Sequence, residues 1–255
     1  KISTVQPGAC RRFEGLPVPS WFKDAGCNAL RSMDVAESDV VLVSYPKTGT
    51  TWLQKMVHSL LRMDDEGVLT TTPEGDVGFK NQCYMEALEH ERPTEPHPIF
   101  GDYCYPDLLN QPTPRIFSTH LRSTWLPRGL TGDPAKGKVV YMVRNPKDAL
   151  VSLHYFRGEA KDGWLGNEHG AGSFARFIDP DTNNAFGNYY THVADMEKYM
   201  GSLPPERGHV MVYEECLEDT EKEIRRLASF LGVVLTDTKL KAILDRVSFK
   251  TMSSN

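Results

Sequence analysis

VVLVSYPKTGTTW, residues 40–52, joins the signal of a strand to the signal of a helix. The run of apolar, mostly β-branched side chains over 40–43 predicts a buried strand. From Trp52 onward, apolar side chains recur on one face of a helix that we expect to run to about Met63. A strand that enters a helix through a short loop aims unpaired backbone N–H groups at one point, where the helix dipole also favours negative charge. The stretch therefore predicts an anion-binding loop.

The side chains of this loop suit the same purpose. Thr50 and Thr51 add hydroxyl donors, Lys47 adds a mobile cation, and Gly49 lets the backbone approach a ligand closely. The plainer alternative is that Thr48 and Thr50 only cap a helix and that Lys47 is a solvated surface charge. The nucleotide-binding pattern G-x-x-x-x-G-K-[ST] is not matched, because the lysine here precedes the glycine.

Further along the chain, short apolar runs alternate with helical patterns. Strand-like runs occupy 115–120, 138–143 and 209–213. A capping-box pattern at Thr220 to Glu223 predicts a helix that ends near Gly232, and a last helix carries apolar residues up to Val247. This rhythm predicts one α/β domain over residues 1–255, with a central parallel sheet flanked by helices.

Composition narrows the functional classes. The 255 residues carry a net charge of -5 and a pI near 5.9, so the composition lacks the positive charge that binding to nucleic acid or an anionic membrane would require. No apolar run approaches the roughly 20 residues of a membrane span, so we expect a cytoplasmic protein. The five cysteines are widely spaced and form no CxxC pair, so we expect reduced thiols rather than disulfides or a zinc site.

Two long segments interrupt the α/β rhythm. Residues 64–114 hold seven prolines, and residues 157–172 hold five glycines. Long irregular insertions in a compact domain often serve as lids or binding loops. We therefore expect these two segments to shape a binding site.

A second polar cluster lies at another predicted strand end. Arg144 ends the strand-like run 138–143, Pro146 is suited to start a helix, and Ser152 follows two turns later. In a parallel sheet the carboxyl ends of the strands open on one edge, where ligands bind. Two anion-binding clusters on one edge imply a ligand with two separated phosphate groups. Taken alone, Arg144 is better explained as part of an ordinary surface ion pair.

Together these clusters resemble the cytosolic sulfotransferase family. The resemblance rests on residues 45–52 (YPKTGTTW), residues 144–148 (RNPKD) and Ser152, and extends from residues 15–19 through 213–215 to 247–252. Members transfer a sulfuryl group from 3'-phosphoadenosine 5'-phosphosulfate (PAPS), leaving the bisphosphate PAP. The resemblance thus implies a sulfotransferase with a P-loop-like phosphosulfate-binding loop and PAPS as co-substrate.

The resemblance also assigns roles to residues. The loop from Lys47 to Trp52 would hold the 5'-phosphosulfate, Arg144 and Ser152 would hold the 3'-phosphate, and three aromatic side chains would surround the adenine. The plainer reading of the aromatic residues is core packing. The implied donor-binding residues are Lys47, Thr48, Gly49, Thr50, Thr51, Trp52, Arg144, Ser152, Tyr213 and Phe249.

The catalytic residues implied by the resemblance are His120 and Lys47. His120 would accept the acceptor's proton, and its unperturbed pKa of about 6.5 would already leave a neutral base at pH 7. Lys47 would stabilise the leaving phosphate oxygen. A sulfuryl group bears less negative charge than a phosphoryl group, so we expect no metal.

This chain departs from the family pattern in several places. Ser118 stands where the family commonly has a lysine, position 122 is not a proline, and Val247 replaces a threonine. The sequence stops at Asn255, before the family's Arg-Lys-Gly segment for the 3'-phosphate and its dimerisation segment. We therefore expect a domain without that C-terminal segment, and homodimer formation is left open.

Two alternative functions belong to other classes. A kinase-like enzyme would need GK[ST] and an acidic magnesium ligand, whereas here a strand ends in Arg144-Asn145. A noncatalytic nucleotide-binding protein of the same fold would fit the early stop, but the presence of Lys47 and His120 opposes it. For the enzyme, the resemblance implies a small, hydrophobic acceptor with a hydroxyl or amine, and candidate lining residues are Phe79, Tyr84, Tyr103 and Phe156.

Overall fold

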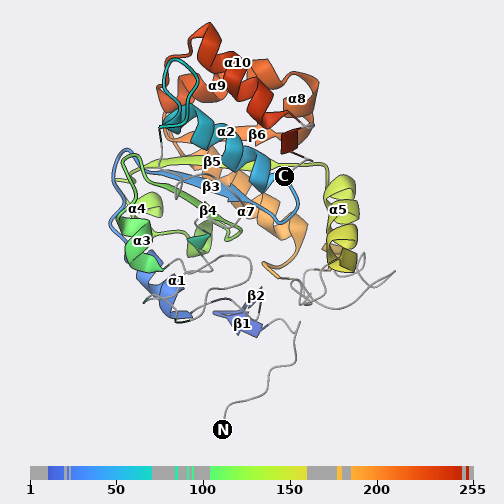
Figure 1. The fold of residues 1–255 in the computed structure, drawn as a ribbon. Coiled ribbons are helices and arrows are strands. Elements are labelled where there is room, and N and C mark those ends of the chain that lie inside the picture. Colours follow the sequence, from blue (N-terminus) through green and yellow to red (C-terminus); the bar gives the residue numbers. More distant parts are fainter. Residues whose placement is uncertain are drawn as a thin grey trace.

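A four-stranded parallel sheet forms the centre of the fold in the computed structural model (Figure 1). Its strands are β3 (Val40–Ser44), β4 (Ile116–Thr119), β5 (Lys138–Val143) and β6 (Gly208–Val212), in the order β4-β3-β5-β6. The predicted strands and the α/β class are thereby confirmed. The structure describes residues 11–19, 22, 24–70, 84–85, 91, 94, 104–159, 177–179, 185–248 and 251–252.

The register of the strands brings their carboxyl ends to one edge. Val43 of β3 lies opposite Thr119 of β4 and Tyr141 of β5, and Val143 of β5 lies opposite Val212 of β6. β3 lies between β4 and β5, although β4 and β5 follow each other along the chain. The order of strands therefore reverses beside β3, and such a switch point opens a crevice at the carboxyl edge.

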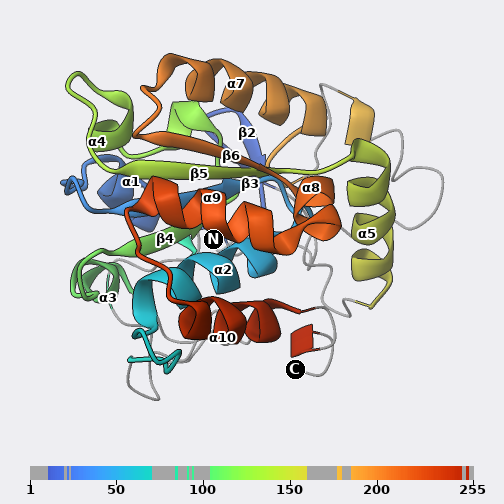
Figure 2. The same cartoon turned by 90° about the horizontal axis from the view of Figure 1, so that it is seen from above.

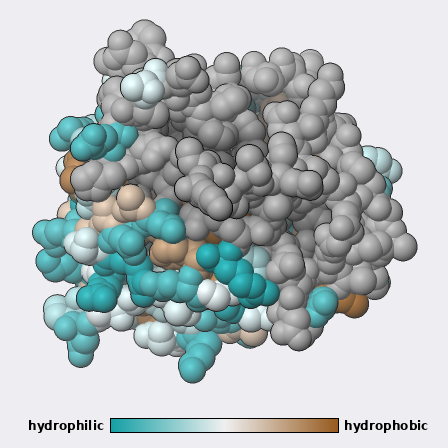
Figure 3. Space-filling view, turned by 90° about the horizontal axis from the view of Figure 1, so that it is seen from below, coloured by the Kyte–Doolittle hydropathy of each residue, from teal (hydrophilic) through white to brown (hydrophobic). Residues whose placement is uncertain are grey.

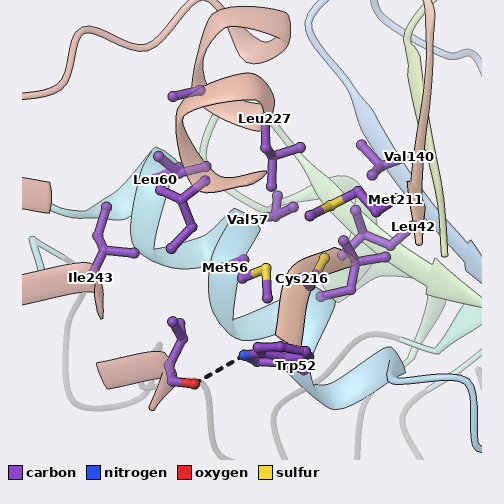
Figure 4. Close-up of a cluster of buried hydrophobic side chains, with 14 of the residues drawn as sticks. Leu42, Trp52, Met56, Val57, Leu60, Val140, Met211, Cys216, Leu227 and Ile243 are labelled. Carbon is purple, nitrogen blue, oxygen red and sulfur yellow. Dashed lines mark hydrogen bonds between the residues drawn. The ribbon is translucent and has the colours of Figure 1, made fainter. Parts of the chain in front are cut away.

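Helices α2 (Thr50–Arg62), α9 (Thr220–Leu231) and α10 (Asp237–Val247) cover one face of the sheet (Figures 1 and 2). Their apolar stripes meet the sheet in a continuous core, which Figure 4 shows around Met56 and Leu60 of α2. Because this core holds α2 along its length, it fixes the position of the helix N-terminus at the carboxyl edge.

The opposite face is covered mainly by α7 (Tyr189–Ser202). Met196 and Met200 of this helix pack in one cluster with Val43 and Tyr141 of the sheet. α5 (Pro146–Glu159) starts directly after β5 and stands beyond the carboxyl edge (Figures 1 and 2). The remaining elements are the antiparallel pair β1 (Arg11–Phe13) and β2 (Leu16–Val18), with α1 (Asp24–Arg31), α3 (Tyr105–Leu109), η4 (Ser123–Trp125), α4 (Arg128–Thr131) and α8 (Tyr213–Glu218).

The start of α9 differs from the prediction. The N-cap is Asp219, whose side chain accepts a hydrogen bond from the Lys222 amide at 3.0 Å. Thr220 lies inside the first turn, and its hydroxyl donates to the Cys216 carbonyl at 2.7 Å. The predicted capping box at Thr220 is therefore wrong by one residue, because an aspartate directly before it caps equally well. The predicted end at Gly232 is confirmed, with a left-handed φ of 75°.

Cys27, Cys104 and Cys216 are buried. Cys10 and Cys83 lie outside the described residues. No described helix is long and apolar enough to cross a membrane. Hydrophilic side chains predominate among the described residues seen from below, with small hydrophobic spots between them (Figure 3).

Candidate active site

A cavity of about 580 Å³ opens at the carboxyl edge of the sheet, where the strand order reverses. This volume is typical of small-molecule sites. The cavity is lined by residues that follow β3, β4, β5 and β6, and by side chains from α5 and the C-terminal stretch. Nine predicted site residues contribute to the lining: Lys47, Gly49, Thr50, Thr51, Trp52, His120, Arg144, Ser152 and Tyr213.

The N-terminus of α2 contributes backbone donors to the cavity. Its N-cap is Gly49, and no side chain caps the helix. The first-turn residues Thr50, Thr51 and Trp52 line the cavity, so the amides left unpaired by helix geometry are close to any ligand there. The buried Thr50 hydroxyl lies 2.6 Å from Ser44 Oγ, which ties the helix start to the end of β3.

Gly49 is required by both conformation and space. Its φ of 106° is in the left-handed region. A Cβ atom would lie 2.7 Å from Tyr213 Cδ2 and 2.8 Å from Met142 Sδ. The loop therefore lies against Tyr213, the first residue of α8, so closely that there is no room for a side chain at position 49.

Thr48 is the one residue of the predicted loop that does not line the cavity. Its side chain is buried, and its hydroxyl donates to the Tyr45 carbonyl at 2.7 Å. It also lies 3.3 Å from the Met142 carbonyl. The Thr48 hydroxyl thus braces the loop from inside and links it to β5.

The two predicted anion-binding clusters are in direct contact. Arg144 Nη1 donates to the Lys47 carbonyl at 3.2 Å, and Lys47 Nζ lies 4.0 Å from the centroid of the Phe156 ring on α5. Lys47 itself has a left-handed φ of 71°, which is uncommon for a residue with a side chain. The loop after β3 is therefore held in shape by Arg144, the first residue after β5.

Arg144 presents an incompletely satisfied cation to this region. Its guanidinium stacks 4.1 Å from the Tyr213 ring centroid, and its buried Nε atom has no hydrogen-bond partner among the residues that the structure describes. Such a buried donor calls for a partner, and a ligand in the cavity could provide one. At the start of α5, the Asn145 amide donates to Glu214 and the Lys147 amide to the Asn145 side chain. This second cluster therefore depends on side chains rather than on a helix N-terminus.

Aromatic side chains form another wall of the cavity. The rings of Trp52 and Tyr213 meet edge to face with centroids 5.3 Å apart. Trp52 Nε1 donates to the Val247 carbonyl at 3.0 Å, which ties α2 to the end of α10 (Figure 4). Phe249 lies outside the described residues. Sequence reasoning missed Leu217 and Met252, which also line this wall; Met252 lay within the family-like stretch 247–252.

His120 lies directly after β4 and is almost fully buried, yet it lines the cavity. Its Nδ1 is 2.8 Å from the Ser44 carbonyl, which can only accept, so Nδ1 carries the proton and Nε2 is the unprotonated nitrogen of the neutral ring. Burial, and to a smaller extent the charge of Lys47, lower the pKa of His120 to about 4, although the hydrogen bond to Ser44 acts in the opposite direction. The imidazole is therefore neutral at pH 7, and its low pKa could not be read from the sequence.

Two candidate acceptor contacts lie in the same cavity. Tyr84 and Phe156 line it, and the Tyr84 ring centroid is 5.2 Å from that of His120. Phe79 and Tyr103 lie outside the described residues. No cluster of three or more His, Cys, Asp or Glu side chains that could hold a metal ion occurs in the part of the chain that the structure describes. The cavity thus combines cationic donors, aromatic surface and a neutral imidazole.

Comparisons with known proteins find relatives along most of this chain. Human sulfotransferase 2B1 is 27% identical over 261 residues, covering 100% of this chain and 63% of its own length. Bovine sulfotransferase 1A1 is 28% identical, covering 99% of this chain and 78% of its own length. Cytosolic sulfotransferase 6 of Arabidopsis thaliana is 31% identical, covering 89% and 67%.

Among solved structures, mouse sulfotransferase SULT7A1 complexed with PAP matches with a TM-score of 0.73 and 25% identity. The match covers 98% of this chain and 76% of the mouse chain. The sulfotransferase domain family matches residues 37–255, which include every predicted site residue. This chain therefore belongs to the sulfotransferase domain family.

Proposed function

We propose that this protein is a PAPS-dependent sulfotransferase that moves a sulfuryl group from PAPS to a hydroxyl or amine of a small hydrophobic acceptor. One observation carries the proposal: the uncapped N-terminus of α2, Lys47 and Arg144 converge on a single cavity, and His120 lies in its wall. The mouse relative SULT7A1 is described as complexed with PAP, the product of such a reaction.

The residues of the cavity suit the two charged ends of the donor. The amides of Thr50 and Thr51 and the ammonium of Lys47 would hold the 5'-phosphosulfate, because helix N-termini and cations favour anions. Arg144 and Ser152 would hold the 3'-phosphate, and a phosphate oxygen would accept a hydrogen bond from Nε of Arg144. The edge-to-face pair of Trp52 and Tyr213 would bind the adenine.

His120 and Lys47 would divide the chemical work. Nε2 of His120 accepts the proton of the acceptor hydroxyl or amine as that atom bonds to the sulfur. The bond between the sulfur and the bridging phosphate oxygen breaks, and Lys47 stabilises the charge that develops on this oxygen. Burial of His120 keeps the imidazole neutral and ready to accept a proton over the physiological pH range.

The aromatic rings beside His120 support the acceptor class. Tyr84 and Phe156 give the cavity apolar surface next to the base, which favours a phenol, steroid or other hydrophobic alcohol or amine. A cytoplasmic location is part of the proposal, because one relative is named a cytosolic sulfotransferase. Homodimer formation stays an open prediction.

A transfer assay tests the function directly. Purified protein is incubated with PAPS carrying ³⁵S in the sulfuryl group and with a panel of phenols, steroids, alcohols and amines. We expect label in at least one acceptor and stoichiometric formation of PAP. Tight PAP binding without transfer to any member of the panel would favour the noncatalytic nucleotide-binding protein instead.

A further inference from the structure

A second histidine, His192, contacts the backbone of His120. It belongs to the first turns of α7 and is 1% exposed. Its Nε2 atom lies 3.2 Å from the main-chain oxygen of His120. Since a carbonyl oxygen only accepts, Nε2 carries the proton and Nδ1 is left as an acceptor. Nδ1 has no hydrogen-bond partner among the described residues.

The carbonyl that His192 contacts lies just beyond the paired part of the sheet. β4 ends at Thr119, which is the last residue paired with β3. The chain then turns, with the Leu121 amide donating to Thr119 Oγ1 at 3.0 Å. The side chain of His120 is held separately, by the hydrogen bond from its Nδ1 to the Ser44 carbonyl. His192 therefore holds the backbone of the proposed base through a hydrogen bond of its own.

The first turn of α7 is well placed to act as a fixed support. Its N-cap Asn188 accepts from the Thr191 amide at 3.0 Å and donates to the Phe177 carbonyl at 3.1 Å. Tyr189 of the same turn donates its hydroxyl to the main-chain oxygen of Arg144. α7 thus contacts the first carbonyl after β5 as well as the first carbonyl after β4.

Packing alone does not account for a histidine at this position. The ring lies between Tyr45 and Tyr141, with centroids 5.4 and 6.0 Å away. An apolar side chain of similar size would fill this space without burying an unpaired Nδ1. The hydrogen bond to His120 is the contact of His192 that an apolar residue could not make.

We propose that His192 is a positioning residue, which holds the backbone of His120 so that the imidazole keeps its place between Ser44 and the cavity. This inference rests on the proposed role of His120 as the base. Misplacement of a catalytic group by about 1 Å can cost roughly 100-fold in rate. Loss of the His192 bond should accordingly reduce kcat while leaving the residues that hold PAP untouched.

The test uses two amides that differ in reach. In His192→Gln the side-chain amide nitrogen can take the place of Nε2, whereas in His192→Asn it is one methylene too short. We expect kcat within about 3-fold of wild type for the glutamine variant and roughly 10- to 100-fold lower for the asparagine variant. The Kd for PAP should stay unchanged in both. The control is His209→Gln, which alters a partly buried histidine of β6, outside the cavity lining, and should change neither quantity.

A second readout does not depend on turnover. NMR of the histidine side chains in the ¹⁵N-labelled protein shows which ring nitrogen of His120 is protonated and gives its pKa. The His120 signal is identified by its loss in His120→Ala. The titratable groups around His120 are Lys47, Tyr84 and His192 itself. We expect Nδ1–H and a low pKa in wild type and His192→Gln. In His192→Asn the pKa should move toward 6.5, because a loosened ring gains access to water.

The outcomes separate this inference from the proposed function. Equal kcat and equal His120 titration in the glutamine and asparagine variants would overturn the positioning role, even in an active sulfotransferase. Parallel loss of PAP binding in the asparagine variant would also overturn it. An inactive wild-type protein would contradict the proposed function, yet the NMR comparison would still decide whether His192 holds His120.

Discussion

His120 departs from the usual behaviour of its residue type, because its surroundings keep it uncharged. Burial and the nearby Lys47 charge lower its pKa to about 4, and the Ser44 carbonyl selects the proton on Nδ1. Nε2 is therefore unprotonated at neutral pH. Protonation of this atom removes the base, so kcat/KM should fall only when the pH drops toward the low pKa of the free enzyme.

Replacement of the imidazole tests its role as the base. His120→Ala should reduce turnover by roughly 100-fold or more, because no positioned side chain then accepts the proton of the acceptor. PAP binding should stay nearly intact, since the phosphate-binding residues belong to other elements. The measurements are initial rates of transfer and calorimetric titration with PAP. Equal loss of both would refute the assignment of the base.

Arg144 can be tested by the phosphate that it is proposed to bind. Arg144→Ala should weaken PAP binding by roughly 10- to 100-fold, the worth of a lost charge-assisted hydrogen bond. Binding of adenosine 5'-phosphosulfate, which has no 3'-phosphate, should change much less. Calorimetry with both ligands measures the difference. Arg225→Ala is the control, because this arginine is half-exposed and paired with Glu221 on α9. Equal weakening of both ligands would remove Arg144 from the 3'-phosphate site.

At this scale the sequence predicted the groups that are neighbours along the chain. Lys47, Gly49 and Thr51 follow from one strand-to-helix junction, and all three line the cavity. The pKa of His120 could not be predicted in this way. It depends on the burial produced by Ser44, Tyr84 and Phe186, which are remote in sequence and adjacent only after folding.

Among the elements, the start of α2 carries most of the proposed donor site. Gly49→Ala should abolish measurable PAP binding or weaken it at least 10-fold, because a Cβ 2.7 Å from Tyr213 must displace the loop or the ring. Gly232→Ala is a matched control at the end of α9. It also has a left-handed φ, of 75°, but its Cβ would meet nothing within 4 Å.

Backbone strain should cost each glycine variant about 1 kcal/mol of stability, and Gly49→Ala should lose more because its Cβ also meets Tyr213 and Met142. Only Gly49→Ala should lose nucleotide affinity. Denaturant unfolding and calorimetry with PAP provide the two measurements. Normal PAP binding by Gly49→Ala would show that the loop does not form the phosphosulfate site.

Element boundaries show where local sequence signals reach their limit. The αL end of α9 at Gly232 was predicted, because glycine is the residue that adopts this conformation without strain. Its beginning was misplaced by one residue, since Asp219 and Thr220 both have capping side chains. Only the folded chain shows that Thr220 donates its hydroxyl back to Cys216 instead.

For the whole molecule, the sequence predicted a parallel sheet but not its strand order. Alternation of strands and helices establishes the class, whereas the position of β3 between β4 and β5 results from packing on both faces. That order places the loop after β3 beside Arg144, so the two predicted anion-binding clusters meet at one cavity. The segment 64–114 could not be interpreted in the same way, because it lacks the periodicity of either helix or strand.

The buried histidines link the stability of the whole molecule to pH. Burial lowers the pKa of His58 and of His120 to about 4 and that of His192 to about 3. In the unfolded chain these side chains have pKa values near 6.5. Between pH 6.5 and 4 the unfolded state therefore binds protons that the folded state does not, and the free energy of unfolding falls as the pH falls.

Each such histidine contributes a slope of up to about 1.4 kcal/mol per pH unit in this window. His58 is suited to test this linkage, because it lies on α2 outside the cavity lining and its pKa is lowered first by burial and then by Arg62 and Arg246. In His58→Gln the free energy of unfolding should depend less steeply on pH, with a slope smaller by the contribution of one histidine. Above pH 7 these histidines are neutral in both states, so they should contribute almost no slope in the wild-type protein. Urea unfolding at intervals from pH 7.5 to 5 measures both slopes. An unchanged slope in the variant would mean that His58 is protonated in the folded state as readily as in the unfolded state, and that its burial does not oppose acid unfolding.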